Sequence, residues 1–191
     1  MVLPQESVIA TPEMIAAAAA ATQAWVEKSV VGLGLCPFAA PVLRAGRMRL
    51  CVSEQTTAEG LVEDLSRELC ALQAADPAQC ETTLLVHPWV FEDFLDFNDF
   101  QDVCGGLLAE LGLEGSLQIA SFHPRFQFAD TAAEDAENCT NRSPHPTLHL
   151  LRESSIAAVV EGGVDTEAIY RTNIATLRAL GAAGWRRLWS D

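Results

Sequence analysis

The sequence predicts a single α/β domain in which helices pack on a short, mostly parallel sheet of about four strands. Three observations support this prediction. Between residues 47 and 121, the hydrophobic spacing alternates between the period of two of a strand and the longer period of a helix. The resulting strand–helix–strand–helix–strand order favours right-handed crossovers between parallel strands, with helices covering the sheet. The 191 residues are 49% hydrophobic, which is enough apolar surface for one core and excludes intrinsic disorder.

The domain is expected to span residues 1–191, because no internal repeat, linker or change of composition divides the chain. In this prediction residues 1–10 form a loose N-terminal segment. The first helix begins at Thr11 and Pro12, since threonine is a good N-cap and proline fits the first helical position. The helix runs to about Val31, where glycines end it.

Two strand–helix units and a third strand are expected next. The alternating segment Arg47–Val52 predicts the first strand, and the short apolar segment Thr82–Val86 predicts the second. A capping box at Thr56-x-x-Glu59 predicts the helix between them. The apolar spacing of Phe100–Leu111 predicts a second long helix, and Ser116–Ser121 predicts the third strand.

The last part of the chain is predicted to add one strand and two helices. Thr147–Leu151 is the fourth strand, either antiparallel or at an edge of the sheet, and a helix follows near Ser154–Val160. A single helix over residues 147–160 is the alternative that periodicity alone leaves open. Asp165 caps the final amphipathic helix. Two tryptophans are expected to dock the C-terminus: Trp185 and Trp189.

The chain is strongly acidic, with 12 lysines and arginines against 26 aspartates and glutamates and a formal net charge of −14. Such a surface repels phosphate backbones and anionic lipids, so we expect no nucleic-acid partner and no membrane partner. No apolar stretch approaches the roughly 18–20 residues that span a bilayer. The first ten residues contain no lysine or arginine, unlike a secretory signal, and a cytoplasmic location is therefore expected.

The six cysteines are expected to be free thiols, because a cytoplasmic chain with a sizeable core does not need disulfides. Cys70 and Cys104 lie in apolar helical patterns and are expected to be small buried residues. Cys36 follows a glycine-rich helix end. It is a candidate catalytic nucleophile if a histidine takes its proton, and a buried turn cysteine is the alternative.

Two histidines stand at matched positions, each directly after a predicted strand and before a proline. His87 follows the second strand and His123 follows the third. Because ligands of α/β sheets bind beyond the carboxyl ends of the strands, we expect both imidazoles to share one pocket and to act as catalytic acid or base. Two unrelated strand-end histidines are the alternative.

The loop before the fourth strand contains Asn141, Arg142 and Ser143. If that strand pairs antiparallel beside the third, the loop lies on the same rim of the sheet as His123. The planar guanidinium of Arg142 then suits a carboxylate or phosphate, and its two neighbours add neutral hydrogen-bond donors. Turn chemistry before proline explains the same residues without a ligand.

A metal site is a further alternative, since imidazole and thiolate are ligands of zinc and iron. Its donors would be His87, His123 and His149 with Cys36 or Cys139, but no H-E-x-x-H spacing supports it, and no metal is assigned. Nucleotide-binding and serine-hydrolase signatures are absent from the sequence, which leaves the cofactor unknown.

Four segments of the chain resemble the signature blocks of a bacterial family known as domain of unknown function 1415. They are Cys36–Ala39, Leu84–Pro88, Phe122–Ala129 and Asn141–Glu153. The resemblance covers nearly the whole chain after about Pro12. It implies a single cytosolic bacterial domain and carries over no catalytic residue.

Three function classes remain open at this point. The first is an enzyme acting on a small anionic metabolite, with Arg142 as the anchor of the anion, His87 or His123 as acid or base, and Cys36 as the nucleophile. The second is a metal-dependent enzyme that uses the same residues. The third is a protein that binds a ligand or a partner without catalysis.

Overall fold

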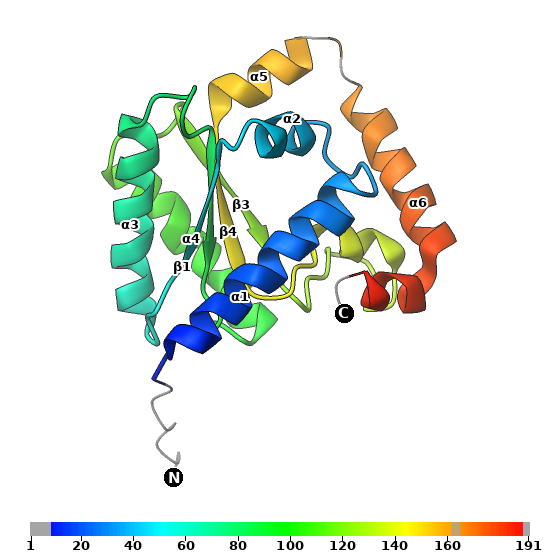
Figure 1. Cartoon of the computed structure of the whole chain (residues 1–191), viewed down its shortest axis with the longest axis horizontal. Helices are drawn as coiled ribbons and strands as arrows, with labels where there is room; N and C mark the ends of the chain where they lie inside the picture. The colour runs from blue at the N-terminus through cyan, green and yellow to red at the C-terminus, as the bar shows by residue number, and fades with distance from the viewer. Residues whose placement is uncertain (1–8, 162, 164, 189–191) are drawn as a thin grey trace.

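Helices cover both faces of a four-stranded sheet (Figure 1). This computed structural model describes residues 9–161, 163 and 165–188. The elements in chain order are α1 (Pro12–Trp25), η1 (Val26–Val31, a π-helix), α2 (Ala39–Arg44), β1 (Met48–Val52), α3 (Ala58–Ala74), β2 (Thr82–Val86), α4 (Phe94–Glu110), β3 (Leu117–Phe122), η2 (Ala136–Asn141, a 3₁₀-helix), β4 (Thr147–Arg152), α5 (Glu153–Glu161) and α6 (Thr166–Arg187).

The strand order is β1-β2-β4-β3, which confirms the predicted α/β class. β1 and β2 are parallel, and β4 pairs antiparallel with both β2 and β3. Three strands therefore run in one direction, although only one neighbouring pair is parallel. The antiparallel alternative predicted for β4 is confirmed, and the strand lies between β2 and β3, where nearly all its side chains are buried.

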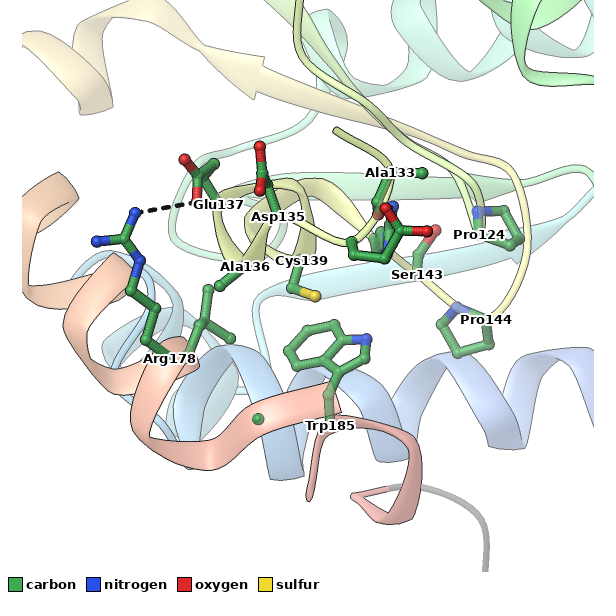
Figure 2. A pocket seen from close by; sticks show the side chains of 14 residues that line it. Pro124, Ala133, Asp135, Ala136, Glu137, Cys139, Ser143, Pro144, Arg178 and Trp185 are labelled. Atoms are coloured by element: carbon green, nitrogen blue, oxygen red, sulfur yellow. Dashed lines mark hydrogen bonds and ion pairs between the residues drawn. The ribbon is translucent and has the colours of Figure 1, made fainter. Parts of the chain in front are cut away.

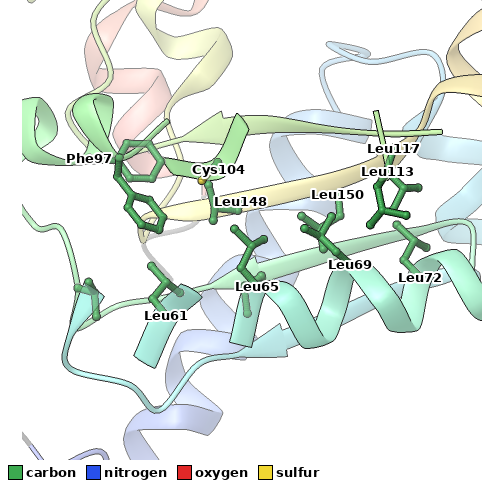
Figure 3. Close-up of a cluster of buried hydrophobic side chains, with 13 residues drawn as sticks. Leu61, Leu65, Leu69, Leu72, Phe97, Cys104, Leu113, Leu117, Leu148 and Leu150 are labelled. Atoms are coloured by element: carbon green, nitrogen blue, oxygen red, sulfur yellow. The ribbon is translucent and has the colours of Figure 1, made fainter. Parts of the chain in front are cut away.

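One face of the sheet packs against α3 and α4 (Figure 1). Figure 3 shows the leucines of α3 lying against those of the sheet. Thr57 caps α3 through the N–H of Gly60, one residue later than the capping box predicts. Cys104 is buried as expected, but the prediction for Cys70 is wrong: its thiol is exposed, because it lies on the outer side of α3. The buried residues of this layer are Leu61, Leu65, Leu69, Leu72, Leu85, Phe97, Phe100, Cys104, Leu113, Leu117, Leu148 and Leu150, with Val90.

The opposite face packs against α1 and η1. The predicted first helix is present, but its last six residues, Val26–Val31, wind as a π-helix. Trp25 and Val26 pack on Leu84 of β2, and the Trp25 ring meets Phe122 edge-on at 5.2 Å between centroids. The sheet therefore has separate apolar layers on its two sides.

The C-terminal helix α6 begins as predicted, with the side chain of Asp165 accepting from the N–H of Ala168. Gly181, at φ 67°, interrupts its helical backbone. The buried Trp185 packs with Leu35 and Leu177, which agrees with the expected docking of the C-terminus. Trp189 and residues 1–8 of the predicted loose segment lie outside the described residues. Within the described chain, none of the helices combines the length and hydrophobicity of a membrane span.

Candidate functional site

Three loops meet at the carboxyl ends of β2 and β3. Val86 and Phe122, the last residues of these strands, both pair with Thr147, the first residue of β4. Beyond the pairing, the N–H of His87 donates to Pro146 O at 3.0 Å, and the N–H of His123 donates to Asn141 O at 3.1 Å. The segment before β4 therefore lies against the loops that follow both parallel strands, where the sequence predicts a site.

His87 is fully buried at this rim. Its Nδ1–H donates to the carbonyl of Val90 at 3.0 Å, which leaves a lone pair on Nε2. Within the described residues, Nε2 has no hydrogen-bond partner. The ring lies 5.5 Å from that of Phe97 and meets Phe91 edge-on. Burial lowers the pKa of His87 to about 4, so the imidazole is neutral at pH 7.

His123 is also fully buried, and both of its ring nitrogens are hydrogen-bonded. Nδ1 accepts from the N–H of Arg125 at 3.0 Å, and Nε2–H donates to Phe91 O at 3.1 Å. The ring stacks on Phe97 at 5.2 Å. Burial lowers the pKa of His123 below its ordinary value, more than the hydrogen bond to Phe91 raises it. The two histidines thus flank one phenylalanine as neutral groups.

Arg142 is held at the rim by backbone carbonyls. Its Nε donates to Phe126 O at 3.1 Å and its Nη2 to Ala133 O at 2.7 Å. No carboxylate among the described residues forms an ion pair with it. Arg142 lines a cavity of about 520 Å³, here called the rim cavity. The lining of this cavity consists of Asp93, Phe94, Leu95, Pro124, Arg125, Gln127, Ala133 and Arg142.

Arg125 is the second arginine of the rim cavity, and our sequence reasoning missed it. Its Nη2 donates to the carbonyl of Glu92 and lies 3.5 Å from Oδ2 of Asp93. Asp93 is also the N-cap of α4 and accepts from the N–H of Leu95. The signal that would have found Arg125 is its place: it comes two residues after His123, in the loop that leaves a parallel strand.

A larger cavity of about 810 Å³ lies between η2 and α6, here called the loop–helix cavity (Figure 2). It shares Pro124, Ala133 and Arg142 with the rim cavity. Acidic side chains of η2 and the segment before it line one side, and Glu137 forms an ion pair with Arg178 of α6 at 3.6 Å. Arg142 therefore stands at the junction of two cavities.

The residues on either side of Arg142 form hydrogen bonds that stabilise the loop. Asn141 donates to Ser121 O at 3.2 Å, and Ser143 donates from its hydroxyl to His145 O at 2.6 Å. Ser143 lines the loop–helix cavity, whereas Asn141 lines a groove of about 420 Å³ on the other side of the loop. Their hydrogen bonds agree with the turn chemistry that was the alternative to ligand binding.

Cys36 lies on the opposite face of the sheet from the two histidines. It lines the groove together with Asn141, and it also lines a small pocket of about 80 Å³ beneath α1. Alternation along the strand explains the separation. Phe122 points to α1, where it meets Trp25, so the next residue, His123, points to Phe97 of α4.

The residues that we expected to share one pocket are therefore divided among several places. The rim cavity and the loop–helix cavity contain Arg142, the loop–helix cavity also contains Ser143, the groove contains Cys36 and Asn141, and His87 and His123 are buried beneath the rim. The division follows from the two faces of the sheet, which sequence position alone does not distinguish.

The donors considered for a metal are separated in the same way. His149 lies on the α1 face, where its Nε2 is 2.7 Å from the hydroxyl of Thr82. Cys139 lines the loop–helix cavity instead. Over residues 9–161, 163 and 165–188, no three histidines, cysteines or carboxylates come together in a way that could hold a metal ion.

The fold and the rim define an α/β protein with an arginine-lined cavity at the carboxyl ends of its parallel strands. The chain belongs to the family described as protein of unknown function DUF1415, whose family model matches residues 17–187. This match confirms the resemblance carried by the four sequence segments. No curated protein and no solved structure matches the chain.

Proposed function

We propose that this protein binds a small anionic molecule, with a carboxylate or phosphate group, in the rim cavity. The observation that carries the proposal is the pair of guanidinium groups, of Arg125 and Arg142, in the lining of one cavity. With Asp93 counted, the lining has an excess of one positive charge, which an anion would balance. The formal net charge of the chain is −14, so two arginines in one cavity are a local exception.

The guanidinium of Arg142 is already oriented and keeps its charge, which favours binding of an anion. Its two carbonyl contacts use two of the five N–H groups of a guanidinium, and the Cys139 thiol is a further partner, so part of the donor set remains for a ligand. Carbonyl oxygens fix the orientation of the side chain without neutralising its charge. A ligand therefore meets a guanidinium that is already ordered, and binding loses less side-chain entropy than at a mobile arginine.

The rest of the lining favours an anion with an apolar body. Phe94, Leu95 and Pro124 contribute apolar surface beside the guanidinium groups, and Leu95 is 69% exposed. A large exposed aliphatic side chain next to a charged anchor suits a ligand with one ionised group and a short hydrocarbon part. Asp93 is the only acidic side chain in the lining, among the residues the structure describes, and Arg125 pairs with it.

The geometry favours binding over the catalytic roles that we assigned from sequence. Both ring nitrogens of His123 form hydrogen bonds with the backbone, and the ring N–H of His87 donates to the carbonyl of Val90. A general acid or base needs a nitrogen within hydrogen-bond reach of the substrate. Cys36 lines other cavities. In this proposal the two histidines shape the loops, and Arg125 and Arg142 hold the ligand.

A cytoplasmic location and the absence of a nucleic-acid partner are parts of the same proposal. All six cysteines, each within the described chain, are free thiols, as is usual in a reducing compartment. The net charge of −14 opposes binding to a phosphate backbone.

The experiment is a titration with benzoate, acetate and inorganic phosphate, followed by amide signals in ¹H–¹⁵N NMR spectra. We expect millimolar benzoate or phosphate to shift the signals of Leu95 and Arg125 first. The variant Arg142→Gln should lose this response. The matched control Arg171→Gln removes an exposed arginine of α6 that pairs with Glu167, and it should respond like the natural protein. Equal binding by Arg142→Gln, or no shift with any of the three anions, would overturn the proposal.

A further inference from the structure

The pocket beneath α1 is a second candidate site, on the face of the sheet opposite to His87 and His123. This α1-face pocket has a volume of about 80 Å³. One water molecule needs roughly 10–15 Å³ of such space, so about five waters or a small apolar group fit. The residues that line the pocket are Trp25, Val26, Val30, Cys36, Phe38, Ala39, Val42, Met48, Thr82, Leu84, Phe122 and His149.

The pocket continues into the groove that contains Asn141. Val30, Cys36 and Phe122 line both spaces, so the thiol of Cys36 lies where the pocket meets the groove. The groove, at about 420 Å³, is several times larger. A ligand larger than the pocket can therefore place one end beneath α1 and the rest in the groove.

His149 presents a free acceptor at this pocket. The hydroxyl of Thr82 donates to Leu150 O at 2.6 Å, so it must accept from Nε2–H of His149, 2.7 Å away. The second ring nitrogen, Nδ1, then carries a lone pair. Within the described chain, nothing donates to this nitrogen. Burial lowers the pKa of His149 to about 4, which keeps the ring neutral and Nδ1 an acceptor at pH 7.

Trp25 contributes its indole ring to the same lining. The side chain is only 2% exposed, and its Nε1–H has no acceptor among the described residues. A buried N–H without a partner is costly, and such groups in native structures call for an explanation. The nitrogen has almost no accessible surface of its own, so a ligand in the pocket contacts the indole ring and not this N–H.

The backbone next to Trp25 is also unusual. Val26 and Val30, which line the pocket, belong to the six-residue π-helix η1. π-helical turns are rare and occur frequently at functional sites, because the inserted residue redirects the side chains around it. The sequence gives no sign of this turn, because the apolar pattern continues from α1.

From these observations we infer that the α1-face pocket binds a small neutral molecule with an apolar body and one hydroxyl group. The hydroxyl hydrogen donates to Nδ1 of His149, and the apolar body packs against the indole ring of Trp25. The lining contains no arginine, lysine or carboxylate, so a charged group is disfavoured inside the pocket. The inference is independent of the rim cavity, since no residue lines both.

The test compares phenol with toluene, which has the same size but no hydroxyl. The readout is the indole Nε1–H signal of Trp25 in a ¹H–¹⁵N spectrum, assigned by its loss in Trp25→Phe. We expect millimolar phenol to shift this signal and to bind about tenfold more tightly than toluene, the effect of one neutral hydrogen bond in an apolar pocket. Phenol should also slow the alkylation of Cys36 by iodoacetamide but not that of Cys139, which lines the loop–helix cavity.

The variant His149→Phe keeps a ring of similar size and removes the acceptor. It should bind phenol and toluene with equal affinity, whereas Arg142→Gln should bind phenol like the natural protein. Toluene bound as tightly as phenol by the natural protein would overturn the inference, even if His149→Phe failed to fold. So would phenol that neither shifts the Trp25 signal nor protects Cys36.

Discussion

Acidification from pH 7 to pH 5 should destabilise the fold through His87. Burial lowers the pKa of this imidazole from the ordinary value of 6.5 to about 4. Between these values the unfolded chain binds a proton that the folded chain does not. The stabilisation is therefore complete above pH 6.5 and is lost as the pH falls toward 4. For one such group, the free energy of unfolding decreases by about 2 kcal/mol between pH 7 and pH 5.

The structure explains why the folded protein resists this proton. Nδ1–H already donates to Val90 O, so the proton must go to Nε2, which has no acceptor within the described chain. It would add a positive charge beside the rings of Phe91 and Phe97, where burial excludes water. The protonated ring would have to leave the core or be left unsolvated there.

Urea unfolding at several pH values measures this effect. The variant His87→Asn keeps a donor near the position of Nδ1 and removes the titrating group. We expect it to be less stable at pH 7, with a loss between pH 7 and pH 5 that is smaller by about 2 kcal/mol than in the natural protein. Cys70→Ser, on the exposed side of α3, is the control and should keep the natural pH dependence. An unchanged pH dependence in His87→Asn would refute the reasoning.

Two further predictions concern arginines that contact buried groups, and they use the same urea assay. Arg152 is buried and donates from Nη2 to the carbonyls of Leu72, Ala75 and Cys80. Arg152→Met should lower the free energy of unfolding by about 2–4 kcal/mol, because the carbonyls at the end of α3 lose a charged donor. A loss below about 0.5 kcal/mol, that of an ordinary surface substitution, would contradict this role. Arg49 pairs with Glu68 through bonds of 2.7 and 2.9 Å, and its side chain is 52% exposed against 4% for Glu68. Arg49→Ala should therefore destabilise more than Glu68→Gln, since it leaves a buried carboxylate unpaired, and the reverse order would show that Glu68 reaches water.

Much of the fold could be predicted because it depends on local patterns. β2 matches its predicted bounds, β1 and β4 differ from theirs by one residue at one end, and β3 is shifted by one residue at both ends. The central place of β4 depends instead on pairing between distant segments. Its nearly continuous apolar residues agree with a strand that is buried on both faces, but they do not identify its neighbours.

The site was harder to predict, because it depends on which face of the sheet each side chain takes. The sequence places His87, His123 and Cys36 near the same rim, because each follows the end of a predicted strand or helix. A shift of one residue reverses the face, however, so Phe122 and His123 point to opposite layers. Arg125 was missed for a different reason: an arginine in a loop gives no periodic signal, and only its place after a parallel strand indicates a role.

The two rim histidines are best understood through the backbone that they hold. Phe91 has a φ of 61°, a strained conformation for a bulky residue, and it lies between β2 and α4. Its carbonyl accepts from Nε2–H of His123, and its ring packs on Phe100 at 4.5 Å. These contacts keep the strained turn in place.

That turn fixes the start of α4 and with it the rim cavity. Asp93, two residues after Phe91, caps α4 and pairs with Arg125, while the N–H of Arg125 donates to Nδ1 of His123. One imidazole thus joins the loop after β2 to the loop after β3, and the joined loops carry Arg125 toward Arg142. Residues typical of catalysis stand at the rim because a neutral imidazole can donate and accept at once, which lets one side chain connect two backbone segments.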